Sequence, residues 1–341
     1  MSAIGIDTHK ATLAACRVDE LGAAAAEATF DNDPAGHRRL LAWIQEGDPA
    51  VVVGIEGSAS FGAAAARFLV GAGVAVREVP PQLTRRERAR TRRLGKSDPN
   101  DALAIARVTA RELDLPPVRL ADATLDLQLL VEAREDVVVE MTRVRNRLHA
   151  DLRSLLPGYG DRAANLVAVR HQRLVGRLLR PIGGVQAELA RRRLARLRAL
   201  GLEERAYTVR IAALVEGHPL LGLPGVGPLV AARLVGEVGD VRRFRSADAL
   251  AALAGVAPIP ASSGQTQRMR LNRGGNRQLN RVFHLIALTQ AAHHPPAQAY
   301  LARKRAEGKT RREALRCLKR RLVRPVFGLL QAGARPADLA A

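Results

Sequence analysis

The sequence is poor in aromatic residues and cysteine, and it has no long hydrophobic run. Phe, Trp and Tyr make up 3% of the 341 residues, so base stacking on aromatic side chains would not be the main way of binding a nucleic acid. No run of about 20 uncharged apolar residues predicts a membrane span, and no signal peptide is evident. Cys16 and Cys317 lie far apart in the chain, which argues against a cysteine-based metal site. These features favour a thiol-reduced, cytoplasmic protein.

Lysine is also scarce, whereas arginine is abundant. The chain carries 54 Lys and Arg against 33 Asp and Glu, a net charge of +21, and only five of the 54 are lysines. Guanidinium groups match the geometry of phosphate oxygens, so a polyanionic partner, above all a nucleic acid, is expected. Codon bias in a GC-rich genome would explain arginine in place of lysine, but not the excess of basic over acidic residues.

The first part of the chain, residues 1–115, reads as an α/β domain. Short apolar or alternating segments predict strands, and longer segments with helix start and stop signals predict helices. The predicted strands are 2–7, 11–18, 23–33, 50–58 and 74–81, and the predicted helices are 34–47, 61–73 and 97–113. The order βββαβαβα predicts an antiparallel meander followed by parallel strands joined through helical crossovers.

The rest of the chain reads as mostly helical. Apolar residues recur every three or four positions from 122 to about 155, which predicts one long helix, and further helical segments follow to about 215. An antiparallel helical pair or coiled coil and a plain helical bundle are both compatible with this pattern. We expect residues 116–217 to form a helical linker and dimerisation region, and residues 218–341 to form a separate, mostly α C-terminal domain.

Four carboxylates stand where a shared site could form. Asp7 and Glu56 end two predicted strands, and Asp98 and Asp101 share one face at a helix start. Each also has a structural explanation: Asp98 before Pro99 suits a helix N-cap, Asp101 suits the first turn, and Asp7 and Glu56 could begin turns. Together they resemble the acidic centre of ribonuclease-H-like enzymes. Such a centre holds Mg²⁺ or Mn²⁺ through oxygen ligands.

The segments that carry these acids give a specific family resemblance. "GIDTHK", "GIEGSASFG" and "GKSDPNDALAIA" resemble the DEDD motif of transposases of the IS one-ten class, which includes Piv-type recombinases. "LPGVGPLVAARLVGEVGDVRRFRSADALAALAGVAPIP" and "SSGQTQRMRLNRGGNRQLNR" resemble the C-terminal transposase domain of that class. The resemblance implies an RNase H-like, RuvC-like N-terminal domain and a DNA transposase.

The resemblance also implies residue roles and partners. It assigns the four acids to metal binding and catalysis, and it assigns a serine before a glycine to attack on a DNA phosphate with a phosphoserine intermediate. Ser263 matches this position, and Ser262 is its neighbour in the same loop. The class acts on DNA under the guidance of a structured bridge RNA. The resemblance also implies that the metal site and the serine come from different domains, of different subunits, so a dimer or tetramer is expected. A bacterial, nucleoid-associated location is then expected.

Basic segments accompany both groups of candidate catalytic residues. Six arginines of residues 84–93 precede the Asp98 helix: Arg85, Arg86, Arg88, Arg90, Arg92 and Arg93. Four more, with Arg281, surround the serine loop: Arg268, Arg270, Arg273 and Arg277. We expect these side chains to bind nucleic acid, although a solvated helix is the plain alternative for 84–93. "LPGVGP" resembles a phosphate-binding helix-hairpin-helix turn or is an ordinary interhelical turn, and residues 303–321 form a further basic segment.

Two other functions are compatible with parts of this pattern. A metal-dependent junction nuclease would need the four acids but not Ser263. A non-catalytic nucleic-acid-binding protein would need only the basic surface. The complete set of acids argues against the binding protein, and a covalent protein–DNA adduct would separate the transposase from both alternatives.

Overall fold

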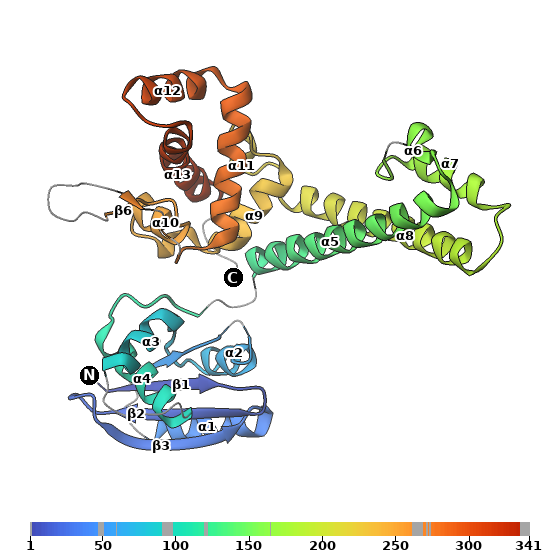
Figure 1. The fold of residues 1–341 in the computed structure, drawn as a ribbon. Helices are drawn as coiled ribbons and strands as arrows, with labels where there is room; N and C mark the ends of the chain where they lie inside the picture. The colour runs from blue at the N-terminus through green and yellow to red at the C-terminus, as the bar shows by residue number, and fades with distance from the viewer. Residues whose placement is uncertain are drawn as a thin grey trace. The chain divides into compact units, whose positions relative to one another are not determined.

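The computed structural model describes residues 2–46, 51–58, 60–90, 98–118, 122–163, 165–260, 269–270, 272 and 274–334. The chain forms two compact units, Met1–Ala121 and Asp122–Ala341 (Figure 1). The first is α/β and the second is almost entirely helical, which confirms the fold class expected from the sequence. Within the described residues, no helix combines the length and the hydrophobicity needed to cross a membrane.

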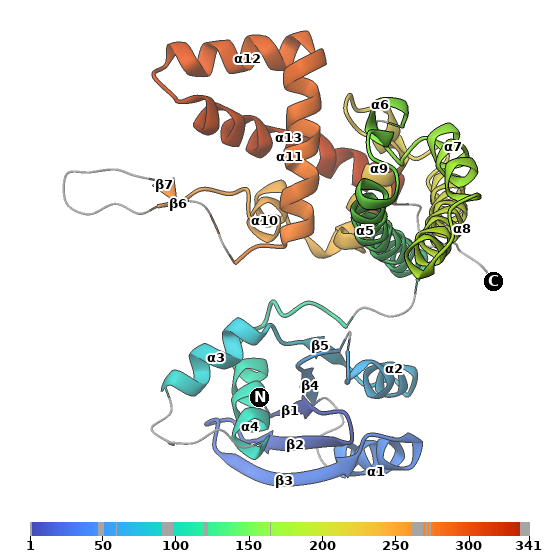
Figure 2. The ribbon, with the colours of Figure 1, turned by 45° about the vertical axis from the view of Figure 1, so that its right-hand side comes forward.

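The first unit is built on a five-stranded mixed sheet in the order β3-β2-β1-β4-β5 (Figure 2). β1, β2 and β3 are antiparallel neighbours, whereas β4 runs parallel to both β1 and β5. The predicted meander and parallel strands are therefore confirmed. The strands are β1 Ala3–Thr8, β2 Thr12–Val18, β3 Ala24–Asp31, β4 Val52–Ile55 and β5 Val76–Glu78.

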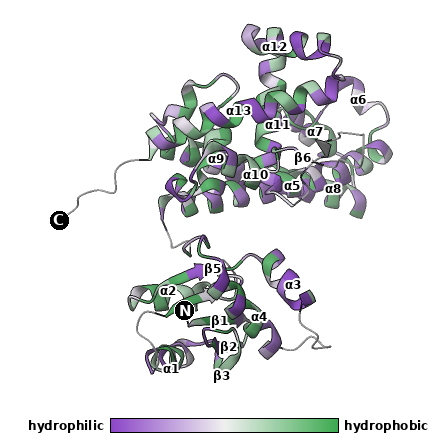
Figure 3. Cartoon of the chain, turned by 90° about the vertical axis from the view of Figure 1, so that its left-hand side faces the viewer, coloured by the Kyte–Doolittle hydropathy of each residue, from purple (hydrophilic) through white to green (hydrophobic). Residues whose placement is uncertain are grey.

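Helices cover the two faces of this sheet. α1 (Pro34–Gln45) and α2 (Ala63–Gly71) pack against the face that carries Ile4, Ile6 and Ile55. α4 (Asp98–Arg111) packs against the opposite face, where Ala102 and Ala106 meet residues of β1 and β2. A further helix, α3 (Pro81–Arg90), lies against α4 and consists mainly of hydrophilic residues (Figure 3). The strand order and the two covered faces place the C-terminal ends of β1 and β4 next to α4.

The second unit begins with a long helical hairpin. α5 (Ala123–Leu155) and α8 (Val185–Leu214) lie side by side, with α6 (Tyr159–Arg162) and α7 (Val169–Leu179) between them in the chain (Figure 1). Ion pairs join Asp151 to Arg193 and Arg134 to Glu204. Because the position on α8 rises as the position on α5 falls, the two helices are antiparallel, as the sequence allowed. The residues of α5 also pair with the C-terminal part of the unit, through Glu135 and Arg233 at 2.7 Å.

The remaining elements of the second unit pack mainly around α13 and α11. The helices are η1 Pro219–Gly222, α9 Pro228–Val238, η2 Val241–Arg243, α10 Ala247–Leu253, α11 Arg277–His293, α12 Pro295–Ala306 and α13 Arg311–Gly333. A two-stranded ribbon pairs β6 (Ile259–Pro260) with β7 (Met269–Arg270). The "LPGVGP" turn follows the short helix η1 and leads into α9, with Gly225 at a φ of 86° that favours glycine. Residues 122–217 and 218–341 thus share one compact unit, whereas residues 116–121 of the predicted linker belong to the first unit, and a functional division near residue 217 stays a prediction.

Candidate active site

Two facing glycines let α4 lie directly on the sheet. Gly5 of β1 pairs with Gly54 of β4. A Cβ on Gly5 would lie 2.1 Å from the backbone nitrogen of Ala106, and one on Gly54 would lie 1.8 Å from Oγ1 of Thr109. Neither position has room for a side chain, so the helix backbone approaches the strands closely. This approach brings the first turn of α4 to the strand ends.

The ends of β1 and β4 place Asp7 and Glu56 side by side. Ile6 pairs with Ile55, and the backbone N–H of Glu56 donates to the carbonyl of Ile6 at 3.2 Å. The hydroxyl of Thr8 donates to the carbonyl of Glu56 at 2.9 Å, which ties the two strand ends together. Each acid lies two residues beyond a glycine covered by α4, so both occupy the α4 face of the sheet.

Asp101 is the third described carboxylate of the predicted set. It lies in the first turn of α4, and the residue is only 7% exposed. Arg88 of α3 donates to Oδ1 of Asp101 at 2.7 Å. This hydrogen bond raises the pKa of Arg88, and the negative charges of Glu56 and Asp7 raise it further. One guanidinium therefore lies within the field of all three carboxylates, which brings together three of the four acids predicted from the sequence.

Asp98 begins α4 three residues before Asp101, and its side chain lies outside the described part of the chain. Among the described residues, no group of three or more His, Cys, Asp or Glu side chains is arranged to hold one metal ion. The predicted four-carboxylate set includes Asp98, so it lies partly outside that description. The donor chemistry still fits a hard divalent cation, because carboxylate oxygens are the ligands that Mg²⁺ and Mn²⁺ prefer.

Two further residues at this edge of the sheet escaped the sequence reasoning. His9 lies two residues after Asp7 in the chain, and its Nε2 is 3.2 Å from Oδ2 of Asp7. Glu78 ends β5, the neighbour of β4, and burial raises its pKa although hydrogen bonds from Ser58 and Gly57 oppose the change. The charge of Glu56 raises the pKa of Glu78 further. The sequence did carry a signal for Glu78, because in "VAVREVPP" it stands near the end of a predicted strand, as Asp7 and Glu56 do.

The arginines of α3 divide between two faces of that helix. Arg85, Arg86 and Arg90 are exposed, as a nucleic-acid-binding face requires. Arg88 instead reaches Asp101, on the same side as the buried residues Thr84 and Glu87. Arg92 and Arg93 lie outside the described residues. A role for this segment in binding nucleic acid stays a prediction.

The predicted serine loop belongs to the second unit. β6 and β7 bracket residues 261–268, so Ser262, Ser263 and Arg268 lie outside the described residues, as does Arg273. Arg270 is described only as part of β7. Arg277 is exposed at the first position of α11, after an N-cap in which Asn276 accepts hydrogen bonds from the backbone of Gln278 and Leu279. The same Asn276 donates to Glu237 at 2.8 Å, which ties the start of α11 to the end of α9.

Comparisons with known proteins agree with this architecture. A transposase family profile, DEDD_Tnp_IS110, matches residues 4–157, which include all four candidate acids. A second profile, described as "Transposase IS116/IS110/IS902 family", matches residues 217–302, which include the serine loop. Two profiles of one kind of enzyme thus match in the order that the sequence segments predicted.

Relatives from bacteria cover most of the chain. The "Insertion element IS110 uncharacterized 43.6 kDa protein" of Streptomyces coelicolor is 31% identical over 83% of this chain and 82% of its own length. The "Mini-circle putative transposase for IS117" of the same organism is 28% identical over 92% of this chain and 90% of its own length. Among solved structures, "T. thermophilus RuvC in complex with Holliday junction substrate" matches 34% of this chain and 99% of its own, with 20% identity and a TM-score of 0.29. The chain belongs to the IS116/IS110/IS902 family of transposases, enzymes that cleave and join DNA.

Proposed function

We propose that this transposase cleaves DNA strands at a metal site formed by Asp7, Glu56, Asp98 and Asp101, with Ser263 as the nucleophile. The proposal is carried by the pairing of the strand ends that hold Asp7 and Glu56, together with Arg88, which forms an ion pair with Asp101 and also interacts with the charges of Glu56 and Asp7. Such a concentration of carboxylates is costly unless cations offset their repulsion. A bound Mg²⁺ or Mn²⁺ would stabilise negative charge on the phosphate oxygens and on the leaving oxygen.

The serine step conserves the phosphodiester energy. The Ser263 oxygen attacks phosphorus, the bond from phosphorus to one sugar oxygen breaks, and the serine proton passes to a base while the released sugar oxygen takes up a proton. A sugar hydroxyl of another strand then attacks the phosphoserine, which restores the serine hydroxyl. Each step replaces one phosphate ester by another, so joining needs no external energy source.

The acids and the serine belong to different compact units of the chain. We propose that a complete site combines the acidic unit of one subunit with the serine loop of another, in a dimer or a tetramer. The net charge of +21 suits RNA as well as DNA, and we propose a structured bridge RNA as the guide. An RNA encoded beside the gene should then bind more tightly than an unrelated RNA of equal length, and equal binding would point to nonspecific attraction.

A covalent adduct tests the central step. The wild-type protein and the variants Ser263→Ala and Ser262→Ala would be incubated with Mg²⁺, guide RNA and end-labelled DNA, then denatured and separated by size. Label should migrate with the protein for the wild type and for Ser262→Ala, and it should be absent for Ser263→Ala. Because both changes remove one hydroxyl from the same loop, Ser262→Ala is a matched control.

The other outcomes identify the alternatives. An adduct that persists in Ser263→Ala and is lost in Ser262→Ala would move the nucleophile by one residue. Cleavage without an adduct in any variant would mean that water attacks the phosphate, as in a junction nuclease. DNA binding without cleavage in the wild type would favour a non-catalytic binding protein.

A further inference from the structure

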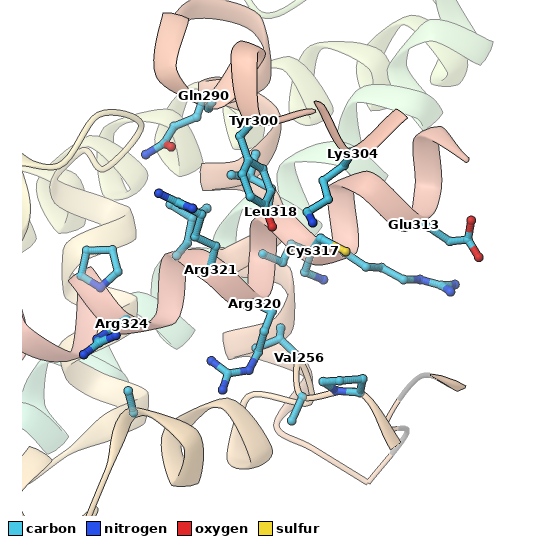
Figure 4. Close-up of a pocket in the computed structure, with 18 of the residues that line it drawn as sticks. Val256, Gln290, Tyr300, Lys304, Glu313, Cys317, Leu318, Arg320, Arg321 and Arg324 are labelled. Carbon is cyan, nitrogen blue, oxygen red and sulfur yellow. The ribbon is translucent and has the colours of Figure 1, made fainter. Parts of the chain in front are cut away.

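The second unit contains a large basic groove that no step above uses. Its volume is about 1540 Å³, and it lies between α10, α12, α13 and the segment 255–258 (Figure 4). Pockets for small ligands typically measure about 300–1,000 Å³. The size of this groove therefore suits part of a polymer better than a small molecule.

Positive charge dominates the lining of this groove. Seven basic residues line it against two acidic ones, Asp248 and Glu313. Asp248 already pairs with Arg320, and Glu313 accepts hydrogen bonds from Thr310 at the N-cap of α13. The basic residues are Lys304, Lys309, Arg316, Lys319, Arg320, Arg321 and Arg324. The acids of the lining are thus engaged, and a net positive charge faces the groove.

One face of α13 supplies the central cations. Cys317, Arg320, Arg321 and Arg324 recur at the spacing of one helical face. Arg321 and Arg324 are exposed, and no carboxylate in the described parts of the chain forms an ion pair with either. The Arg321 guanidinium lies 4.9 Å from the ring centre of Tyr300, which holds it over the groove (Figure 4). Two exposed guanidinium groups on one helix face, one of them positioned by Tyr300, suit adjacent phosphates of a nucleic-acid strand.

The opposite wall connects the groove to the serine loop. Gly255, Val256, Ala257 and Pro258 line the groove, and the next residues, Ile259 and Pro260, form β6. β6 leads directly into the loop that carries Ser263. In the sequence, Ser263 follows the last residue of β6 by three positions, so the groove lining and the proposed nucleophile belong to consecutive stretches of the chain.

From this geometry we infer that the groove binds the sugar–phosphate backbone of the DNA strand that Ser263 attacks, through Arg321 and Arg324. The inference rests on the proposed serine function for the identity of the strand. The +21 net charge alone would attract any nucleic acid; the position beside β6 is what favours DNA.

Cys317 offers a probe of this groove without any mutation. It lines the groove and is partly exposed, whereas Cys16, the other cysteine, is fully buried. Alkylation by N-ethylmaleimide, followed by mass spectrometry of the peptides, would report on access to Cys317. Single-stranded DNA at about ten times its Kd should slow this reaction by about tenfold, because only about a tenth of the protein remains free. High salt should restore the rate, since it weakens phosphate contacts.

Two double variants distinguish binding in the groove from nonspecific attraction by positive charge. Arg321→Gln with Arg324→Gln should remove the protection, whereas Arg311→Gln with Arg312→Gln should keep it. The second pair loses the same charge from exposed positions of α13 that do not line the groove. Circular dichroism would confirm that both double variants remain folded.

Three results would overturn the inference: DNA binding seen by fluorescence anisotropy without protection of Cys317, protection by RNA of equal length but not by DNA, or equal loss in both double variants. The serine proposal is tested independently by Ser263→Ala, which should keep the protection. Protection without a covalent adduct would leave the groove as a DNA site and remove Ser263 as nucleophile. An adduct without protection of Cys317 would support Ser263 as nucleophile and would exclude the groove as the DNA site.

Discussion

The guanidinium of Arg88 donates to the carboxylate of Asp101 at 2.7 Å, and its charge also acts on Glu56 and Asp7. A helix rich in arginine thus directs one side chain inward, to the acids of the neighbouring helix and strands. A divalent cation at these carboxylates would meet this positive charge. Arg88 and the metal ion are therefore expected to compete for the same negative charge.

Removing the charge of Arg88 should strengthen metal binding. We expect Arg88→Gln to raise the affinity for Mn²⁺ by about threefold to tenfold, because the side chain is 36% exposed and water screens part of the repulsion. Electron paramagnetic resonance of free Mn²⁺ during a titration measures this affinity.

Arg85→Gln is the matched control for Arg88→Gln. It removes the same charge from an exposed position of α3 and should change the Mn²⁺ affinity much less. Weaker binding in Arg88→Gln would show instead that the arginine positions Asp101 for the metal. If both variants change the Mn²⁺ affinity equally, Arg88 affects metal binding only through the net charge of the protein.

Neutral replacements of Asp7 and Glu56, which stand at the ends of β1 and β4, should abolish DNA cleavage and leave DNA binding unchanged. Asp7→Asn and Glu56→Gln keep the size of each side chain but remove the negative charge that a cation needs. We expect the rate of strand cleavage to fall by at least about 10²-fold. A gel assay of labelled DNA measures cleavage, and fluorescence anisotropy measures binding. Glu46→Gln, at an exposed position after α1, should leave both unchanged. Full cleavage by Asp7→Asn would exclude this site.

The close approach of α4 to β1 should make Gly5 intolerant of a side chain. In Gly5→Ala, the new Cβ would clash with backbone atoms of Ala102 and Ala106, so helix and strand must separate. We expect a loss of about 1–3 kcal/mol in the free energy of unfolding, together with reduced cleavage.

The single tryptophan, Trp43, lies in the first unit, so its fluorescence during urea denaturation reports on that unit alone. Gly71→Ala is the control, because nothing lies within 4 Å of the added Cβ at the last position of α2. An unchanged unfolding midpoint in Gly5→Ala would contradict the described packing.

Features that repeat along the chain were predictable from the sequence. The succession of strands and helices along the first unit followed from apolar segments separated by turn residues, and Asp7 and Glu56 stood out because each ends such a segment. That their two strands are neighbours in the sheet needed the structure. The long helix α5 followed from the period of its apolar residues. The pairing of α5 with α8 needed the structure, because the same pattern also fits a bundle.

Features that depend on contacts between distant segments were not predictable. The basic segment 84–93 has the composition of a solvated helix, and nothing in it distinguishes Arg88 from its neighbours. Only the docking of α3 on α4 divides the helix into an outer face and an inner face. In the same way, the requirement for glycine at positions 5 and 54 is evident only from the structure, in which the two residues pair beneath α4.

Acidification should weaken the first unit through His37, which supports the loops after Asp7 and Glu56. Its Nε2 bonds to Asn32, whose amide donates to the carbonyls of His9 and Phe61. Burial lowers the pKa of His37 below its ordinary value of 6.5, although Asp33 opposes the shift. Because the folded state disfavours the charged ring, its stability contribution is complete above pH 6.5 and is lost as the pH falls toward the lowered pKa. His37→Gln, which cannot titrate, should flatten the pH dependence of Trp43-monitored unfolding in that window, whereas His293→Gln should not. Parallel curves for wild type and His37→Gln would rule out this coupling.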